Sequence, residues 1–172
     1  MKQLVLVLLF FGIAIIYFGC SDDGISNQDE QLTTSLEKKV HTYFSGTSEN
    51  IGVVDPGKTN VLPNGTIHIR GLVVQTNEVM TDTRVTGIVT WVVHMNIYPD
   101  GSDNRWGTGE LTIPNVGRWD MHYGGGFVPG EGVTYEVDGH GKGELRGLKA
   151  HWTYNLPNPP GIFDVQGYIE EK

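Results

Sequence analysis

The six histidines are the side chains whose chemistry is most open, because neutral imidazole is the commonest metal ligand in proteins. They stand at positions 41, 68, 94, 122, 140 and 151. None of them falls in the spacing of a His-Glu-x-x-His motif or of paired Cys/His zinc ligands. A β-meander could bring His122 and His151 together, but surface or hydrogen-bonded histidines explain the pattern more simply. We therefore expect no metal site and no cofactor.

Acid–base chemistry has its candidates in Glu110, Asp120 and Glu144, with arginines close by in the sequence. In the segment GRWDMHYGG, an extended chain puts Arg118, Asp120 and His122 on one face and apolar side chains on the other. Because apolar faces normally point inward, the charged face is predicted to be a solvated exterior. The reverse orientation would place an acid, a base and a cation in one cavity, as an isomerase or a cyclase needs.

Five aromatic side chains give the clearer indication of a ligand. Two-residue periodicity puts all of them on the inner faces of the expected strands: Trp91, Trp119, Tyr123, Trp152 and Tyr154. Aromatic walls suit an apolar or sugar-like ligand, and they suit a packed core without a ligand equally well. The packed core is the favoured interpretation. These five residues are the candidates for a ligand pocket, and no catalytic residue is assigned.

The strands that position these side chains are marked by alternation and by prolines. RVTGIVTWVVHMNIY alternates apolar and polar residues over its whole length, which is a strong strand signal. Proline-containing turns such as LPNG, YPDG, IPNVG, VPGEG and LPNPPG separate the candidate strands. These strands are expected near residues 66–77, 83–98, 105–113, 117–124, 132–138, 143–155 and 162–170, with an earlier one near 40–45 or 51–55.

The connections between these segments are too short for crossover helices, so neighbouring strands should pair antiparallel as hairpins. A meander of about eight strands usually removes its free edges by closing on itself. The 24 glycines of the chain fit sharply turned and closed β structure. The sequence therefore predicts an all-β protein, an antiparallel up-and-down barrel of about eight strands. A β-sandwich is the alternative.

A family resemblance supports the barrel. The stretch GHGKGELRGLKAHWTYNLPNPPGIFDVQGYIE, residues 139–170, resembles the C-terminal half of the allene oxide cyclase/dirigent-like barrels. The shared pattern is a Gly-x-Gly start, a long strand, a glycine turn and a closing strand. The resemblance implies a barrel fold, in a family that includes cyclases and stereo-directing proteins. No catalytic signature of that family can be matched to residues of this chain, so no activity is carried over.

The N-terminus has the layout of an export signal. One lysine precedes an apolar run from Leu4 to Phe18, which is shorter than a membrane-spanning helix. Gly19-Cys20 resembles the end of a bacterial lipobox, whose cysteine becomes lipidated. Cys20 is the only cysteine, so it cannot form an internal disulfide. We expect it to anchor the protein to a membrane through acyl chains.

The residues around the anchor indicate where the protein is located. Ser21, rather than Asp, follows Cys20, so the inner-membrane retention signal is missing and the outer membrane is the expected location. Cys-Ser-Asp-Asp also resembles the acidic export tags of surface lipoproteins in Bacteroidetes-type Gram-negative bacteria, which favours the cell surface over the periplasmic side. The expected organisation is a signal peptide over 1–19, a lipidated polar tether over 20–39 and a barrel domain over 40–172.

Two classes of function fit this organisation. The net charge of −8, without a basic stripe, excludes a typical nucleic-acid binder. The favoured hypothesis is a lipid-anchored envelope lipoprotein whose barrel binds a small ligand, a glycan or a partner protein without catalysis. The alternative is a barrel enzyme of the cyclase or isomerase kind. A filled aromatic lumen would favour the first, and a cavity lined by two or more ionisable side chains would favour the second.

Overall fold

The computed structural model describes residues 39–157 and 159–171, so the expected signal peptide, Cys20 and nearly all of the tether lie outside the described residues. The described part consists of strands with one short 3-10 turn, η1 (Thr83–Val85). Its strands are β1 (Val40–Asp55), β2 (Lys58–Val61), β3 (Ile67–Met80), β4 (Gly87–Ile97), β5 (Asp103–Ile113), β6 (Gly117–Val128), β7 (Gly132–Gly143), β8 (Lys149–Leu156) and β9 (Phe163–Glu171). Within these residues, no helix has the length and apolar character needed to cross a bilayer.

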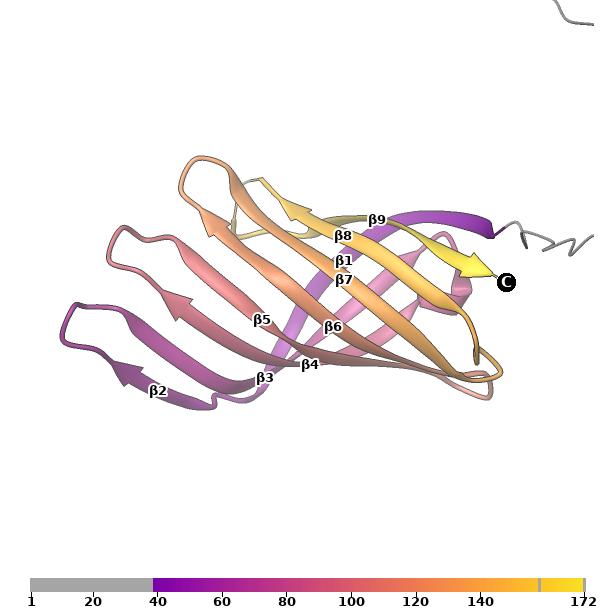
Figure 1. Cartoon of the computed structure of the whole chain (residues 1–172), viewed down its shortest axis with the longest axis horizontal. Helices are drawn as coiled ribbons and strands as arrows, with labels where there is room; N and C mark the ends of the chain where they lie inside the picture. Colours follow the sequence, from indigo (N-terminus) through magenta and orange to yellow (C-terminus); the bar gives the residue numbers. More distant parts are fainter. Residues whose placement is uncertain (1–38, 158, 172) are drawn as a thin grey trace, which may run out of the picture. The chain divides into compact units, whose positions relative to one another are not determined.

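The strands form one antiparallel sheet that closes on itself. Its order is β1-β9-β8-β7-β6-β5-β4-β3-β2, and β1 pairs with β3 as well as with β9. β1 runs along β9 in its first part and along β3 in its second part, and this double pairing closes a barrel of eight strands. β2 is an additional strand that pairs with the beginning of β3 (Figure 1). The predicted eight-stranded antiparallel barrel is confirmed, and the β-sandwich is excluded.

The structure differs from several of the predicted strands. The strand expected over 83–98 begins only at Gly87, because Thr83–Val85 form η1. The strands expected over 117–124 and 132–138 extend to Val128 and Gly143.

β1 is one strand of 16 residues that covers both segments between which the sequence left a choice. β2 was not predicted, because KTNV is short and exposed and has no apolar alternation. The strand expected over 143–155 begins only at Lys149, since Gly143 and Gly147 have φ values of 70° and 93°. These left-handed conformations suit a turn rather than an extended strand.

Four of the proline-containing turns have the same local structure. In each, the residue before proline accepts a hydrogen bond from the N–H three positions later, at 2.9–3.1 Å. The four accepting carbonyls belong to Leu62, Tyr98, Ile113 and Val128. Proline fixes φ at the second turn position, so each hairpin reverses at a position that the sequence specifies.

Large aromatic rings fill much of the barrel interior, and glycines make room for them. Trp119 is fully buried, and its ring packs edge to face against Trp152 with centroids 6.5 Å apart. A Cβ on Gly139 would lie 3.3 Å from both indoles. A Cβ on Gly109 would lie 2.4 Å from the ring of Trp91, which is closer than real atoms approach. Some of the glycines therefore serve interior packing as well as turns.

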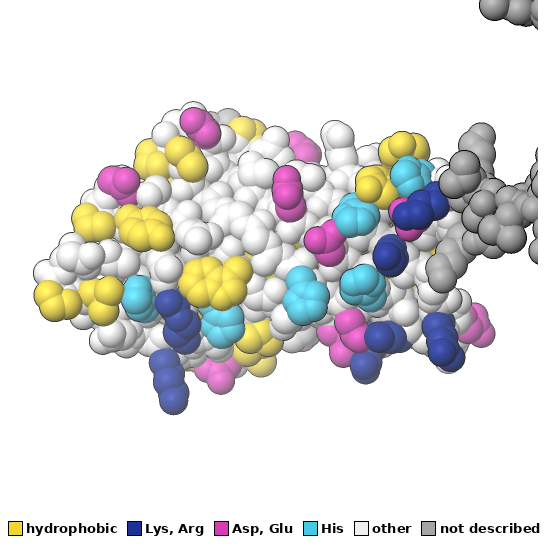
Figure 2. All heavy atoms as spheres, viewed as in Figure 1, with side chains coloured by type: hydrophobic (Ala, Val, Ile, Leu, Met, Phe, Trp, Pro, Cys, Tyr) yellow, Lys and Arg dark blue, Asp and Glu magenta, His cyan; other side chains and the backbone are white. Residues whose placement is uncertain are grey.

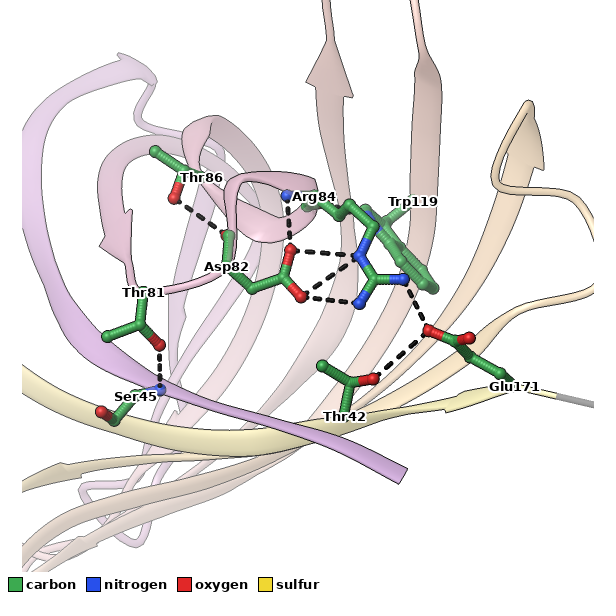
Figure 3. Close-up of polar contacts among 8 residues, drawn as sticks. All are labelled: Thr42, Ser45, Thr81, Asp82, Arg84, Thr86, Trp119 and Glu171. Atoms are coloured by element: carbon green, nitrogen blue, oxygen red, sulfur yellow. Dashed lines mark hydrogen bonds and ion pairs between the residues drawn. The ribbon is translucent and has the colours of Figure 1, made fainter. Parts of the chain in front are cut away.

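A polar network closes the end of the barrel at which β1 begins and β9 ends. Arg84 of η1 donates hydrogen bonds to both oxygens of Asp82 and, at 2.7 Å, to Glu171 (Figure 3). Thr42 of β1 donates to the same Glu171 oxygen at 3.3 Å. The indole N–H of Trp119 donates to the backbone carbonyl of Arg84 at 2.6 Å. These residues, called the end-closing network below, tie η1, both chain ends of the barrel and the buried core together.

Candidate functional site

A cavity of about 110 Å³ lies inside the barrel, away from the end-closing network. Its aromatic and charged walls come from six strands, β4 to β9, which contribute Trp91, Arg105, Tyr123, Tyr135, Tyr154 and Phe163. β1 reaches the cavity at Ser48, eight residues after its first residue Val40. At about 3.3 Å per residue, this places the cavity roughly 26 Å along the strand from the start of the barrel. The lumen is thus filled towards one end and hollow towards the other.

Glu78 of β3 is buried in the wall beside this cavity, with only 1% of its surface exposed. Its Oε1 accepts hydrogen bonds from the hydroxyls of Ser48 at 2.9 Å and Thr76 at 2.6 Å. Thr76 Oγ1 in turn accepts the indole N–H of Trp91 at 3.0 Å. Oε2 of Glu78 has no hydrogen-bond partner among the described residues. One oxygen of the carboxyl group is therefore fixed, and the other is left unpaired.

The unpaired oxygen lies in an environment that favours the protonated acid. Burial raises the pKa of Glu78 from 4.5 to about 6, although the hydroxyls of Thr76, Ser48 and Tyr154 partly offset this rise. The Tyr154 hydroxyl lies beside the carboxyl group and contributes to lowering its pKa, although no hydrogen bond of ordinary geometry joins the two groups. Glu78 can consequently gain or lose a proton near neutral pH, as a general acid or base requires.

The phenol of Tyr135 and the guanidinium of Arg105 also line the cavity. The hydroxyl of Tyr135 is buried without a partner, and burial raises its pKa to about 12. Arg105 donates from Nε to Asp103 at 2.8 Å, and its guanidinium lies 5.7 Å from the centroid of the Tyr135 ring. Asp103 also accepts the backbone N–H of Phe127 at 3.1 Å. The cation in the cavity wall is thus fixed in place and neutralised by its own carboxylate.

The five aromatic residues selected from the sequence all lie inside the barrel, but they divide into two groups. Trp91, Tyr123 and Tyr154 line the cavity. Trp119 and Trp152 pack against each other in the filled core and do not line it. The cavity therefore contains three of the five candidates.

Sequence reasoning missed Glu78, Arg105 and Tyr135. Glu78 follows QTN, where polar residues occupy both faces of β3 and hide the alternation. The available signal was position: Glu78 stands two residues after Thr76 and four after Val74, so all three point to the same side of the strand. Tracing that face back to the apolar part of β3 would have predicted an inward carboxyl group.

The charged triplet of β6 lies outside the barrel, as the favoured interpretation predicted. The Nε of Arg118 lies 2.9 Å from Asp120, whose side chain is 41% exposed. His122 is exposed on the same face. Glu110 on the neighbouring strand is also half-exposed and lies 3.5 Å from Arg118. The reverse orientation, with these groups in a cavity, is wrong.

The histidines likewise stay on the outer surface. His122 of β6 and His151 of β8 lie on either side of Asp138 of β7, directly opposite it in the sheet. Asp138 contacts Nδ1 of His151. Among the described residues, no three histidine, cysteine or acidic side chains are placed to hold a metal ion.

Comparisons with known proteins identified no relative of this chain. No protein-family model matches the chain, and searches of curated proteins and of solved structures gave no match. What the protein binds must therefore follow from its own side chains.

Proposed function

We propose that the protein is a lipid-anchored envelope lipoprotein whose barrel binds a small organic ligand in its lumen. The observation that carries this proposal is the cavity of about 110 Å³ with unpaired polar atoms in and beside its walls. A water molecule needs only about 10–15 Å³ of such space, so the cavity is large enough for a small ring or a short chain. Buried polar atoms in native proteins usually have partners, and a ligand would supply them here.

The walls define the chemistry of the ligand. Its body should be apolar or aromatic, because the rings of Trp91, Tyr123 and Phe163 form much of the surface. It should also carry a group that can both donate and accept hydrogen bonds. The hydroxyls of Tyr135 and Tyr154 line the cavity and have no partner among the described residues, so each can donate to such a group and accept from it. A small ring with a hydroxyl or an amide group fits this description.

Binding can be tested with simple probes. Indole, benzyl alcohol and cyclohexanol would be offered at millimolar concentration and detected by ligand-observed NMR. Val74→Phe should fill the cavity that Val74 lines and abolish binding. Val73→Phe is the matched control, since Val73 is the next residue of β3 and points outward, opposite exposed Val92. Equal binding by both variants, or no binding of any probe to the wild type, would refute the proposal.

A second candidate function is acid–base catalysis on the bound ligand. The lining of the cavity favours it, because Arg105 and Tyr135 are ionisable and Glu78 lies beside the lining residue Thr76. The pKa of Glu78, about 6, and its unpaired Oε2 beside the cavity suit proton transfer to or from a ligand carbon. This is the polar lumen of an isomerase or a cyclase. A ligand retained by the purified protein would be incubated with it in D₂O and examined by mass spectrometry. Deuterium uptake by the wild type and not by Glu78→Gln supports catalysis. Uptake that is equal for both, or missing from both, supports binding alone.

The membrane anchor is a proposal that the sequence supports. The apolar run from Leu4 to Phe18 followed by Gly19-Cys20 predicts lipidation at Cys20 and an outer-membrane location. The first strand of the barrel begins at Val40, and the cavity lies towards the other end of that strand. This placement agrees with an anchor on the N-terminal side that leaves the cavity accessible. In cells fed an alkyne-labelled fatty acid, the wild type should become labelled and Cys20→Ser should not. Protease added to intact cells would then distinguish surface exposure from the periplasmic side.

A further inference from the structure

Outside the barrel, a row of uncharged and acidic residues crosses the sheet from β5 to β1. Its members lie directly opposite one another on successive strands, and all are exposed: Trp106, Gly124, Glu136, Thr153, Gln166 and Ser45. We call this row the outer strip. Much of it runs over β5–β8, the face turned to the viewer in Figures 1 and 2. The barrel wall separates it from the lumen cavity, so it is a distinct surface.

Aromatic rings border one end of the outer strip. Tyr43 and Tyr168 lie two residues along β1 and β9 from Ser45 and Gln166, and they are directly opposite each other. Their ring centroids are 5.9 Å apart, and His41 stacks on Tyr168 at 4.4 Å. Tyr43 is 74% exposed. Aromatic rings at the surface that lie side by side offer flat apolar faces to a ligand.

The surface is hollowed between these rings and the strip. A groove of about 580 Å³ is lined by Tyr43, Tyr168, Glu136, Thr153 and Gln166 among others. A second hollow of about 640 Å³ shares Ser45, Thr153 and Gln166 with the first, so the two are continuous. Within the described residues, the side chains of Glu136, Thr153 and Gln166 take part in no hydrogen bond or ion pair. Their polar groups are available to a ligand.

Trp106 provides an aromatic platform at the other end of the strip. It is 37% exposed, and the guanidinium of Arg70 lies 4.9 Å from its ring centroid. The neighbouring position across the sheet is Gly124, where a Cβ would meet no atom within 4 Å. Its backbone conformation does not require glycine, unlike that of Gly125 with a φ of 149°. Because Gly124 has no side chain, the surface beside the indole of Trp106 stays open.

The charges of the groove restrict the class of ligand. Glu136, Asp138 and Asp164 line the two hollows, and no lysine or arginine does. A phosphate, a sulfate or a nucleic acid would be repelled. A purely apolar ligand would leave the amide, hydroxyl and carboxylate groups without partners. A neutral ligand with apolar faces for the aromatic rings and many hydroxyls for the polar row meets both conditions.

We propose that the outer strip binds a neutral oligosaccharide. One sugar ring lies against Tyr43 and Tyr168, a distant one lies beside Trp106, and the units between them hydrogen-bond to Gln166, Thr153 and Glu136. A chain of several units is needed, because the row crosses five inter-strand spacings of about 4.8 Å each. This site is independent of the proposed lumen ligand, and each can exist without the other.

The test uses four hexasaccharides as probes: maltohexaose, cellohexaose, xylohexaose and mannohexaose. The protein is the full chain. Binding would be measured by saturation-transfer NMR and calorimetry at up to millimolar concentration. At least one hexasaccharide should bind. Tyr43→Ala and Gly124→Leu should each weaken it roughly tenfold or more, which equals about 1.4 kcal/mol. Both positions are exposed, so neither change should unfold the barrel.

Matched controls separate the strip from general effects. Tyr98→Ala removes an exposed tyrosine at a distant hairpin turn, and Gly52→Leu adds the same side chain at another exposed glycine with open space around it. Both should change the affinity less than twofold. The lumen variant Val74→Phe should also bind normally. The proposal is overturned if no hexasaccharide binds, if Tyr43→Ala and Gly124→Leu bind like the wild type, or if only the polycation spermine binds at these residues.

Discussion

Glu78 should make the barrel less stable at neutral pH than at acidic pH. Its pKa is 4.5 in an unfolded chain and about 6 in the folded protein, because burial disfavours the charged form. Because its pKa is raised, Glu78 binds its proton more tightly in the folded state than in the unfolded state. The stabilisation of the folded state by the protonated Glu78 is complete below about pH 4.5 and is lost as the pH rises through about 6. At 1.36 kcal/mol for each pH unit, the loss is about 2 kcal/mol.

Glu78→Gln should remove this loss and keep the local structure. The amide oxygen can still accept from Ser48 and Thr76, as Oε1 does now. The amide nitrogen takes the place of the unpaired Oε2, near the Tyr154 hydroxyl. Since glutamine does not titrate, the variant should gain about 2 kcal/mol relative to the wild type between about pH 4.5 and about pH 7. Below about pH 4.5 the difference between the two proteins should be constant.

Urea unfolding followed by tryptophan fluorescence measures this difference. Both proteins would be unfolded at pH values from about 4 to about 8, and their free energies of unfolding would be subtracted at each pH. Glu136→Gln is the control, because it makes the same change at an exposed position on the outside of the barrel. A difference between wild type and Glu78→Gln that does not change with pH would show that Glu78 is not a desolvated acid. The acid–base role would then be withdrawn as well.

Other substitutions test the packing and the closed end of the barrel. Arg84→Ala should cost about 1 kcal/mol after solvent screening, and the cost should shrink at acidic pH, where the carboxylates of the end-closing network lose their charge. Gly109→Ala should cost about 2–3 kcal/mol because its Cβ would meet Trp91, whereas Gly52→Ala has open space and should be nearly neutral. Trp119→Phe should cost about 2 kcal/mol through the lost hydrogen bond and lost volume. Urea unfolding at neutral pH measures all four, and equal stabilities for Gly109→Ala and Gly52→Ala would contradict the packing argument.

The barrel could be predicted because its signals are local. Alternation in β4, β6 and β8 assigns side chains to two faces within a few residues, and it placed all five aromatic candidates inside. The hairpins end at prolines whose fixed φ determines the turn, so four reversals follow from short motifs. Antiparallel pairing then follows from short connections. None of these inferences needs knowledge of residues far away in the chain.

The cavity could not be predicted, because it depends on contacts between distant strands. Glu78 meets Ser48, which is 30 residues away, and lies near Tyr154 on a strand across the barrel. Alternation says that a side chain points inward but not at which level of the lumen it lies. That level depends on register, including the irregularities between β1 and β3. For this reason Trp119 and Trp91 had the same sequence signal and different surroundings.

The two halves of the lumen show why the cavity, and not the whole interior, is the site to test. Around Trp119 and Trp152 the rings pack edge to face, and the indole N–H of Trp119 has a partner, whereas the buried indole N–H of Trp152 has none among the described residues. Around Glu78 a buried acid lowers stability by about 2 kcal/mol at neutral pH. A glutamine would keep its hydrogen bonds without that cost. Stability alone therefore does not account for a carboxyl group at this position, whereas a ligand that bonds to its unpaired oxygen does.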